Sequence, residues 1–397
     1  MSSVEEELRH ALDERKVNHS FRSLRCPLPQ RSALVDFCSN DYLGFARSEI
    51  LREKIKEFES KCHDVLIGST GSRLISGNTR FYEELEDRIS KFHHADAGLI
   101  FNSGYDANLG FFSCIPQRTD TILYDQLVHA SIRDGIRLSF ARGFSFEHNN
   151  VDALERRLKG ATGNIFVAVE SVYSMDGDCS PLTEIVELCS HYSANLIVDE
   201  AHATGVFGNR GEGKVVELGL EKRIFARLYT FGKALGCHGA IVLGSETLRT
   251  YLVNFARSFI FTTALPFHSL ISISCAYDQL GLSNKERSDL KSRISYFKGK
   301  IGPDIRHRMI ESNSAIQCVV IRGNEKVRSA ARNLQEDGFD VRPILHPTVP
   351  KGSERLRICL HAFNTEDEID GLMRAMSGEL LNAQVGDGVP FMRSQKS

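Results

Sequence analysis

A repeated alternation of helical and strand patterns places the strongest constraint on how this chain can fold. From about residue 84 to residue 245, an amphipathic helical stretch, a short apolar run and a turn follow one another several times. Strands are predicted at 99–101, 122–124, 144–146, 165–169, 196–198, 228–230 and 240–243, and helical stretches at 83–93, 130–139, 151–158 and 182–192. Because parallel strands are connected through crossover helices, this order predicts an α/β domain with a mostly parallel sheet.

The pattern changes after residue 265 and indicates a second, smaller unit. Helical segments run to about residue 300, followed by predicted strands at 315–321, 341–345 and 357–360 and helices at 326–336 and 366–381. Near the N-terminus, Val4, Leu8, Ala11 and Leu12 share one face of a predicted docking helix. We therefore expect an N-terminal docking helix and arm (1–45), a large α/β domain (46–265) and a small C-terminal α+β domain (266–397).

Composition and charge exclude several classes of partner. The 397 residues include 49 Lys and Arg against 51 Asp and Glu, so the net charge of −2 argues against nucleic acid or an anionic membrane as the main partner. No stretch approaches the roughly 20 apolar residues that cross a membrane. The ten cysteines lie at least ten residues apart, so no zinc motif or disulfide framework is predicted, and the expected location is the cytoplasm.

Four chemical signals follow apolar strand runs, at the strand ends where open parallel sheets bind ligands. They are a glycine-containing turn that opens a helix at 102–108, His129, Asp199 and Lys233. Singly, each has an ordinary structural explanation: a helix cap, a hydrogen-bonded filler, a paired buried carboxylate and a surface lysine. Together they offer a phosphate seat, a ring partner, a carboxylate and a reactive amine, which are the groups that pyridoxal phosphate requires.

Other classes of protein fit less well. Residues 199–202 spell Asp-Glu-Ala-His, the acidic box of certain helicases, but the nearest glycine-rich loop, 208–215, lies downstream and ends in Val215 where a Mg²⁺-binding Ser or Thr is needed. A serine hydrolase of the nucleophile-elbow type needs a Gly-x-Ser-x-Gly turn, which the sequence lacks. A cofactor-free binding protein of the same fold is a further alternative, and the presence of the Lys, Asp and His set argues against it.

Five motifs in a fixed order make the sequence resemble one enzyme family. The motifs lie at 39–44 (SNDYLG), 71–78 (GSRLISGN), 103–108 (SGYDAN), 199–202 (DEAH) and 230–233 (TFGK). They are similar to those of the α-oxoamine synthases, which are fold-type I pyridoxal-phosphate-dependent enzymes, and the resemblance runs from about residue 30 to 375. It implies the fold of that class, a large domain with a mostly parallel sheet and a smaller C-terminal α+β domain.

The resemblance implies a role for each residue around the cofactor ring. Lys233 would form the Schiff base with pyridoxal phosphate, Asp199 would pair with the ring nitrogen, and His129 would stack on the ring. His202 and Ser174 would reach the phenolic oxygen.

The resemblance also implies a phosphate site and an assembly. The turn at Gly104 and Tyr105 would offer N–H groups to the phosphate, with the Thr230 hydroxyl beside them. Thr262 would complete the site of the neighbouring subunit. A site shared in this way implies a homodimer.

A third group of residues would contact the substrates. Arg357 would bind the carboxylate of the amino acid, a task that suits its planar guanidinium, and Asn40 would assist it. His129 would face the substrate as well as the cofactor. Arg22 and Thr348 would face the acyl substrate.

The resemblance implies a pyridoxal-phosphate-dependent acyltransferase. The segments 125–131, 174–178 and 347–350 are most similar to family members that join L-alanine to pimeloyl-CoA, or to a pimeloyl carrier protein, with loss of CO₂ in biotin biosynthesis. Other members use glycine or serine with a different acyl thioester: 2-amino-3-ketobutyrate CoA ligase, 5-aminolevulinate synthase and serine palmitoyltransferase. The positions of Lys233, Asp199 and His129 are common to all of them, so these residues do not decide between the substrates.

Overall fold

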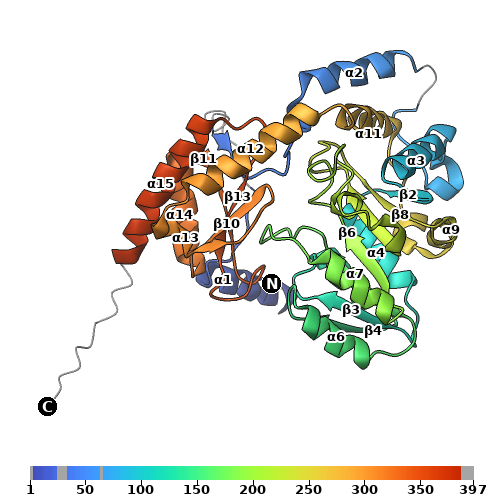
Figure 1. Cartoon of the computed structure of the whole chain (residues 1–397), viewed down its shortest axis with the longest axis horizontal. Helices are drawn as coiled ribbons and strands as arrows, with labels where there is room; N and C mark the ends of the chain where they lie inside the picture. Colours follow the sequence, from blue (N-terminus) through green and yellow to red (C-terminus); the bar gives the residue numbers. More distant parts are fainter. Residues whose placement is uncertain (1–2, 25–33, 63–65, 386–397) are drawn as a thin grey trace.

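The computed structural model describes residues 3–24, 34–62 and 66–385, and its largest feature is a seven-stranded sheet (Figure 1). Its strands are β2 (Ala97–Phe101), β3 (Thr121–Asp125), β4 (Arg142–Phe146), β5 (Ile165–Glu170), β6 (Asn195–Asp199), β7 (Ala226–Thr230) and β8 (Ala240–Gly244). They lie in the order β2-β8-β7-β6-β5-β3-β4, and within this sheet only β8 runs antiparallel to its neighbours. Each strand contains one of the seven predicted runs, so the prediction of a mostly parallel sheet is confirmed.

Helices cover both faces of this sheet, as the alternation of side chains along β5 shows. Phe166 and Ala168 belong to one apolar cluster, and Val167 belongs to another on the opposite face. Two buried faces explain why the strands read as continuous apolar runs. Between residues 45 and 260 the helices are α2 (Glu49–Ser60), α3 (Arg80–Phe92), α4 (Gly104–Cys114), α5 (Ala130–Leu138), α6 (Val151–Lys159), α7 (Leu182–His191), α8 (Lys214–Glu217), α9 (Glu246–Phe255) and α10 (Arg257–Ile260), with 3₁₀ turns at Phe45–Arg47 and Glu221–Arg223 and a π-helical turn at Arg73–Gly77.

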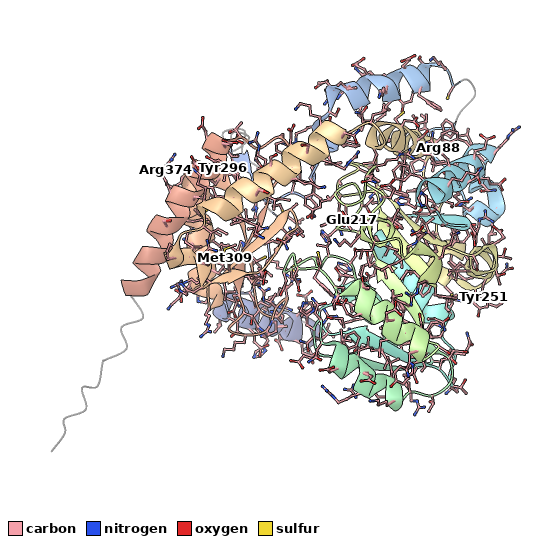
Figure 2. All side chains as sticks on the ribbon, in the orientation of Figure 1. Arg88, Glu217, Tyr251, Tyr296, Met309 and Arg374 are labelled. Carbon is pink, nitrogen blue, oxygen red and sulfur yellow. The ribbon has the colours of Figure 1, made fainter. Side chains whose placement is uncertain are left out.

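A smaller antiparallel sheet forms in the C-terminal part. Its order is β12-β13-β10-β9, and Cys318 of β10 lies opposite Arg357 of β13. These strands are β9 (Met309–Ile310), β10 (Ile316–Val320), β12 (Arg342–Ile344) and β13 (Arg355–Cys359), and the accompanying helices are α11 (Phe267–Leu280), α12 (Asn284–Lys300), α13 (Pro303–Arg306), α14 (Asn324–Glu336) and α15 (Glu366–Val385). Tyr296 of α12, labelled in Figure 2, donates a hydrogen bond of 3.1 Å to the Asp370 carboxylate of α15, which connects these two helices.

The N-terminal arm joins this smaller unit. Strand β1 (Val35–Asp36) pairs in parallel with β11 (Phe339–Asp340). The predicted helix is present as α1 (Ser3–Val17), but none of its residues is buried in this chain, and Leu8 is 57% exposed. The apolar face of α1 therefore has no docking surface within the described part of the subunit. The domain boundaries at 45/46 and 265/266 stay predictions. In the described residues, no helix has the length and apolar character that crossing a membrane requires.

Candidate active site

Residues from several strand ends converge on one cavity of about 270 Å³. It lies outside the carboxyl ends of the parallel strands, where open sheets bind ligands. The cavity contains eight of the predicted site residues: Asn40, Gly104, Tyr105, His129, Asp199, His202, Thr230 and Lys233. Asn108, Ser131, Glu170, His238, Gly239, Ser103, Ala201 and Gly232 complete its lining. Three larger surface grooves, of about 940, 400 and 390 Å³, contain none of these residues.

A chain of hydrogen bonds starts at Lys233, in the turn between β7 and β8. The Lys233 Nζ donates to His202 Nε2 over 2.9 Å, and His202 Nδ1 lies 2.7 Å from the Tyr42 hydroxyl. The Tyr42 hydroxyl in turn donates to Asn40 Oδ1 over 3.1 Å, and Arg357 Nη2 donates to the same oxygen over 3.0 Å. These hydrogen bonds therefore connect the Lys233 amine, which lines the cavity, to Arg357 of the small sheet.

Burial changes the pKa values of two side chains in this series of hydrogen bonds, Lys233 and His202. Desolvation lowers the pKa of Lys233 to about 8, although the carboxylates of Asp199 and Glu170 act in the opposite direction. Desolvation and the neighbouring Lys233 charge hold the pKa of His202 well below its usual value, so the ring is neutral and its Nε2 can accept from the lysine. An amine with a lowered pKa is available as a nucleophile or base near neutral pH.

The Asp199 carboxylate is fixed at the end of β6 by two donors. Asn108 Nδ2 donates to Oδ2 over 2.9 Å, and the Ala201 backbone N–H donates to Oδ1 over 2.9 Å. Asn108 Nδ2 also donates to Ser131 Oγ over 3.1 Å, and Ser131 Oγ lies 2.7 Å from His129 Nδ1. The carboxylate and the histidine ring are thus held by one shared network.

The N-terminus of α4 lies at the cavity, where the sequence predicted a phosphate site. Its first residues, Gly104 and Tyr105, lie at the cavity, and Ser103 caps the helix by accepting a hydrogen bond from the Asp106 N–H over 3.0 Å. A Cβ at Gly104 would lie 2.5 Å from Thr230 Cγ2, so glycine is required for the close approach of the two segments. The buried Thr230 Oγ1 has no hydrogen-bond partner and is available to a ligand.

Five predicted residues lie outside the lining of the cavity. Arg357 reaches it through Asn40, and the Ser174 backbone carbonyl accepts a hydrogen bond of 2.7 Å from Arg357 Nε. Thr262 Oγ1 accepts from Asn102 Nδ2 over 3.0 Å. Arg22 and Thr348, far apart in sequence, meet through a hydrogen bond of 3.1 Å. Their predicted contacts with substrate or with a neighbouring subunit stay predictions.

The sequence analysis did not predict several residues that line the cavity. Among them, Glu170 contributes a buried carboxyl group and Asn108 donates hydrogen bonds to Asp199 and Ser131. Glu170 is the last residue of β5, and burial raises the pKa of its carboxyl to about 8, while its Oε1 has no partner. The predicted strand stopped at Val169, one residue short of the polar strand end. Asn108 lies one helical turn after Gly104, so the helical period could have placed it at the same ligand site.

The geometry around 208–215 argues against the helicase interpretation. The Glu200 carboxylate accepts hydrogen bonds from the backbone N–H groups of Lys214 (2.7 Å) and Val215 (2.8 Å). A Cβ at Gly213 would lie 2.2 Å from Glu200 Oε2, so the carboxylate occupies the place that a phosphate would need. Burial raises the pKa of Glu200 to about 7. This glutamate is a structural residue of the loop.

Comparisons with known proteins agree with this geometry. The profile of the family described as aminotransferase class I and II matches residues 32–376. An 8-amino-7-oxononanoate synthase of Emericella nidulans is 44% identical, with 94% of this chain and 95% of the relative covered.

Solved structures resemble the chain in fold. An 8-amino-7-oxononanoate synthase of Francisella tularensis has a TM-score of 0.76 and 28% identity and covers 89% of this chain and 99% of its own. A serine palmitoyltransferase from S. paucimobilis with a bound PLP–myriocin aldimine has a TM-score of 0.82 and 27% identity, with 89% and 88% covered. The predicted resemblance and fold class are therefore confirmed. From the match over most of its length and the identity to its relatives, the chain belongs to the aminotransferase class I and II family.

Proposed function

We propose that this chain acts as an 8-amino-7-oxononanoate synthase, a pyridoxal-phosphate-dependent acyltransferase that joins L-alanine to a pimeloyl thioester with release of CO₂. The observation that carries the proposal is the convergence of Lys233, Asp199 and His129, from three separate strand ends, on one cavity. The 44% identity to a relative of that activity supports the choice of reaction. The thioester is pimeloyl-CoA or a pimeloyl carrier protein.

The residues present fit pyridoxal phosphate. The unpartnered Thr230 hydroxyl and the N-terminus of α4 suit its phosphate, and the Asp199 carboxylate suits its ring nitrogen. The Lys233 amine suits its aldehyde, and His129 lies at the cavity as the ring partner. Ser174 and His202 would complete the surroundings of the phenolic oxygen. When bound, pyridoxal phosphate supplies an electron-withdrawing ring that stabilises negative charge at the amino-acid Cα.

The residues of the chain would supply positioning and proton transfer. Arg357 would hold the L-alanine carboxylate, and Asn40, already bonded to Arg357 Nη2, fixes the guanidinium in place. The Lys233 amine would remove the Cα proton and return it after C–C bond formation, C–S bond cleavage and loss of CO₂. The hydrogen bond to His202 aims this amine, because the neutral ring accepts from it. Asp199 would keep a proton on the ring nitrogen.

A second copy of this chain would complete the site. Thr262 does not line the cavity of its own subunit, and its neighbour Phe261 is 71% exposed. We propose a homodimer in which Thr262 of one copy contacts the phosphate bound by the other. Exposed Leu74 and Ile75 would be covered in the same interface.

The main alternative is a synthase of the same family that uses glycine or serine. The similarity in fold to the serine palmitoyltransferase structure, with a TM-score of 0.82, is the observation that favours this alternative. The higher sequence identity of the 8-amino-7-oxononanoate synthase relative, 44% against 27%, favours L-alanine.

A paired-substrate assay tests the proposal. The protein loaded with pyridoxal phosphate is incubated with L-alanine, glycine or L-serine, each with pimeloyl-CoA, and CO₂, free thiol and the amino-ketone product are measured by mass spectrometry and thiol titration. We expect all three products in equal amounts with L-alanine. If only glycine or serine supports turnover, or if another thioester is required, the chain is instead a synthase of the alternative type. Lys222→Ala, a change of an exposed lysine, is the control for Lys233→Ala.

A further inference from the structure

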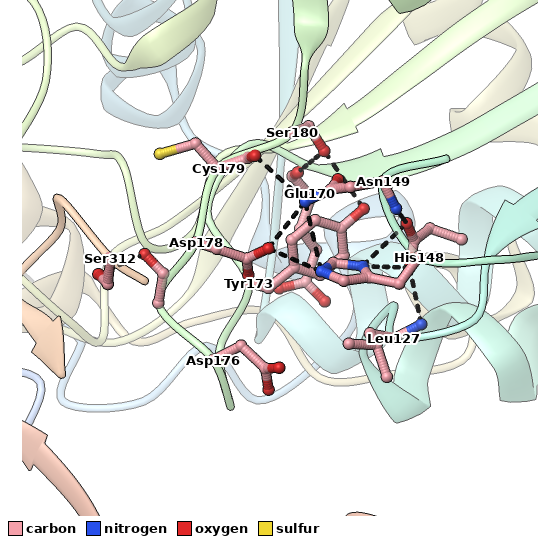
Figure 3. Close-up of polar contacts among 12 residues, drawn as sticks. Leu127, His148, Asn149, Glu170, Tyr173, Asp176, Asp178, Cys179, Ser180 and Ser312 are labelled. Carbon is pink, nitrogen blue, oxygen red and sulfur yellow. Dashed lines mark hydrogen bonds and ion pairs between the residues drawn. The ribbon is translucent and has the colours of Figure 1, made fainter. Parts of the chain in front are cut away.

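His148 contacts two carboxylates, and Figure 3 shows its ring beside the carboxylate of Asp178. Its Nδ1 lies 2.9 and 3.0 Å from the two oxygens of Asp125, and its Nε2 lies 2.7 Å from Asp178 Oδ2. The Tyr173 ring packs edge-on against the imidazole, with 4.5 Å between the ring centroids. The side chains of His148 and Asp178 are 18% and 22% exposed, and that of Asp125 is 1% exposed.

This arrangement requires a positively charged ring. Both ring nitrogens face carboxylate oxygens, and a neutral imidazole can donate from one nitrogen only. Burial disfavours the charge, but the hydrogen bonds to Asp125 and Asp178 outweigh it and raise the pKa of His148 to about 10. The adjacent Asn149 adopts a φ of 52° and donates through its side chain to Asp178 over 2.8 Å, so the local backbone is fixed by the same carboxylates.

Asp125 connects His148 to the turn that carries His129. It ends β3 and accepts a hydrogen bond of 2.8 Å from the Leu127 N–H. It also accepts from the Asn149 N–H over 2.8 Å. His129, two residues after Leu127, is the N-cap of α5 and lines the cavity. The Asp125 carboxylate therefore fixes the segment that delivers the His129 ring.

Asp178 connects His148 to a loop, residues 171–180, which follows β5 and reaches the small sheet. The loop carbonyl of Ser174 accepts from Arg357 Nε over 2.7 Å. Ser312 donates to the carbonyl of Gly177 over 2.8 Å, and Asp176 forms an ion pair of 2.5 Å with Arg355. The 171–180 loop is thus bonded to both sheets of the molecule.

We propose that His148 is a positioning residue that ties the 171–180 loop to the turn before His129 and so sets where the Arg357 guanidinium stands relative to the His129 ring. His148 does not line the cavity, so it acts through these two residues. The inference rests on the proposed function for the cofactor, the amino acid and the role of Arg357 in binding its carboxylate. If Arg357 is displaced, the protein loses its grip on the substrate carboxylate while the cofactor residues Lys233 and Asp199 stay in place.

The test compares an amino acid with an amine that lacks the carboxylate. Protein loaded with pyridoxal phosphate is titrated with L-alanine and with ethylamine, and the apparent dissociation constants are read from the absorbance change. We expect His148→Gln to weaken L-alanine binding by roughly tenfold and to leave ethylamine binding and bound pyridoxal phosphate unchanged. His191→Gln, a change of an exposed histidine of α7, is the matched control. Hydrogen exchange of peptides covering 171–180 should accelerate in His148→Gln alone.

Equal preference for L-alanine over ethylamine in wild type and His148→Gln would overturn the inference, whatever the exchange shows. If His148→Gln does not fold, Asp178→Ala provides the same comparison, because it removes the acceptor on the loop side of His148 and leaves Asp125 in place. Failure of the proposed function gives a different result: the wild type itself does not respond to L-alanine. The exchange measurement needs no substrate, so unchanged exchange in 171–180 would overturn the inference in that case also.

Discussion

Lys233 and Asp199 both follow apolar strands, yet the structure surrounds them differently. Lys233 is desolvated, and its pKa falls to about 8, so the neutral amine is accessible. Asp199 accepts from Asn108 and from the Ala201 N–H, and these two donors fix the carboxylate in place. A base with a lowered pKa beside a fixed carboxylate suits the proposed removal of a proton from an amino acid.

Replacement of Lys233 tests its covalent role. We expect Lys233→Ala to bind pyridoxal phosphate without a covalent link, so borohydride reduction no longer attaches the cofactor to the protein. Loss of the base should lower turnover by roughly 10²–10⁴-fold or more. Mass spectrometry after reduction measures the link, with Lys222→Ala as the control. A reduced cofactor attached to another lysine would contradict the assignment.

Replacement of Asp199 separates the charge from the geometry. The amide of Asp199→Asn still accepts from the Ala201 N–H, so the cofactor should bind in place. Without the negative charge, exchange of the alanine Cα hydrogen with deuterated water should slow by roughly 10²-fold or more, which proton NMR measures. The matched change Asp96→Asn, at an exposed carboxylate, should leave exchange unchanged. Wild-type exchange in Asp199→Asn would exclude the proposed role.

At the scale of residues, the sequence predicts site residues that closely follow strands. It does not predict site residues whose place depends on contacts with residues distant in sequence. Asp199 directly follows the apolar run 196–198, and Lys233 comes three residues after the run 228–230. Glu170 directly follows the apolar run 165–169, so the same rule could have identified it. Arg357 lies within a strand of the other sheet, and only the 3.0 Å bond to Asn40 connects it to the cavity.

At the scale of elements, the N-terminus of α4 is the proposed phosphate site, and its shape depends on Gly104. In Gly104→Ala the added Cβ would lie 2.5 Å from Thr230 Cγ2, so α4 or β7 must shift. We expect the affinity for pyridoxal phosphate to fall by about tenfold, equivalent to about 1.4 kcal/mol, measured by fluorescence during cofactor removal and return. Gly299→Ala, in α12 with open space around the Cβ position, should bind the cofactor normally. Equal affinities in the two variants would argue against this phosphate site.

The contact between β3, the turn after β4 and the 171–180 loop predicts a pH dependence of stability. The pKa of His148 is about 10 in the folded chain and about 6.5 when unfolded, so its contribution is complete below pH 6.5 and is lost as the pH rises to about 10. The groups that face it are Asp125, Asp176, Asp178 and Tyr173, and burial holds the pKa of Tyr173 well above its usual value.

We therefore expect His148→Gln to unfold at lower temperature than wild type at pH 6, with a loss of roughly 2–4 kcal/mol. The difference should shrink towards pH 10, as the wild type loses its charged ring. Melting temperatures at pH 6, 8 and 10 measure this. A difference that does not change with pH would show that the ring carries no charge. His191→Gln should match the wild type at every pH.

Long elements could be predicted from the sequence, and very short ones could not. The helices at 130–139, 151–158 and 182–192 have a clear 3.6-residue period and form as α5, α6 and α7. Strands β1, β9 and β11 contain two residues each, too few for an alternating pattern. The apolar face of α1 predicts burial, but that face is exposed among the residues that the structure describes, so its burial was not correctly predicted.

At the scale of the whole molecule, the proposed homodimer predicts complementation between two defective chains. Lys233→Ala lacks its own base, and Thr262→Ala lacks the hydroxyl that it would lend to its partner. In a mixed dimer, one site combines Lys233 of one copy with Thr262 of the other and is complete.

Co-expression of the two variants with different tags, followed by purification of the mixed dimer, should restore activity at low pyridoxal phosphate concentration. Neither variant alone should show that activity under the same conditions. A mixed dimer no more active than Thr262→Ala alone would place Thr262 outside the shared site. A mixture of Lys233→Ala and Lys222→Ala chains controls for dilution of the active subunit.

The sequence predicted only part of the arrangement of the two sheets. The alternation of helices and strands predicted parallel pairing, whereas β8 runs antiparallel between β2 and β7. The short link from β7 to β8 contains the Lys233 turn and no crossover helix, which is the sign of an antiparallel neighbour. The bonds that the 171–180 loop makes to both sheets arise from residues distant in sequence and have no local pattern.

The pairing of β1 with β11 has a consequence for how the protein is made. The two strands are separated by about 300 residues, which a ribosome adds in roughly 15–60 s. During that interval the large sheet can fold as it leaves the ribosome, while residues 35–36 still lack their partner strand, β11. Asn40, which follows β1 and lines the cavity, is therefore secured only near the end of translation. The turn that carries Lys233 is therefore made early, and the hydrogen bond between Asn40 and Arg357 forms last.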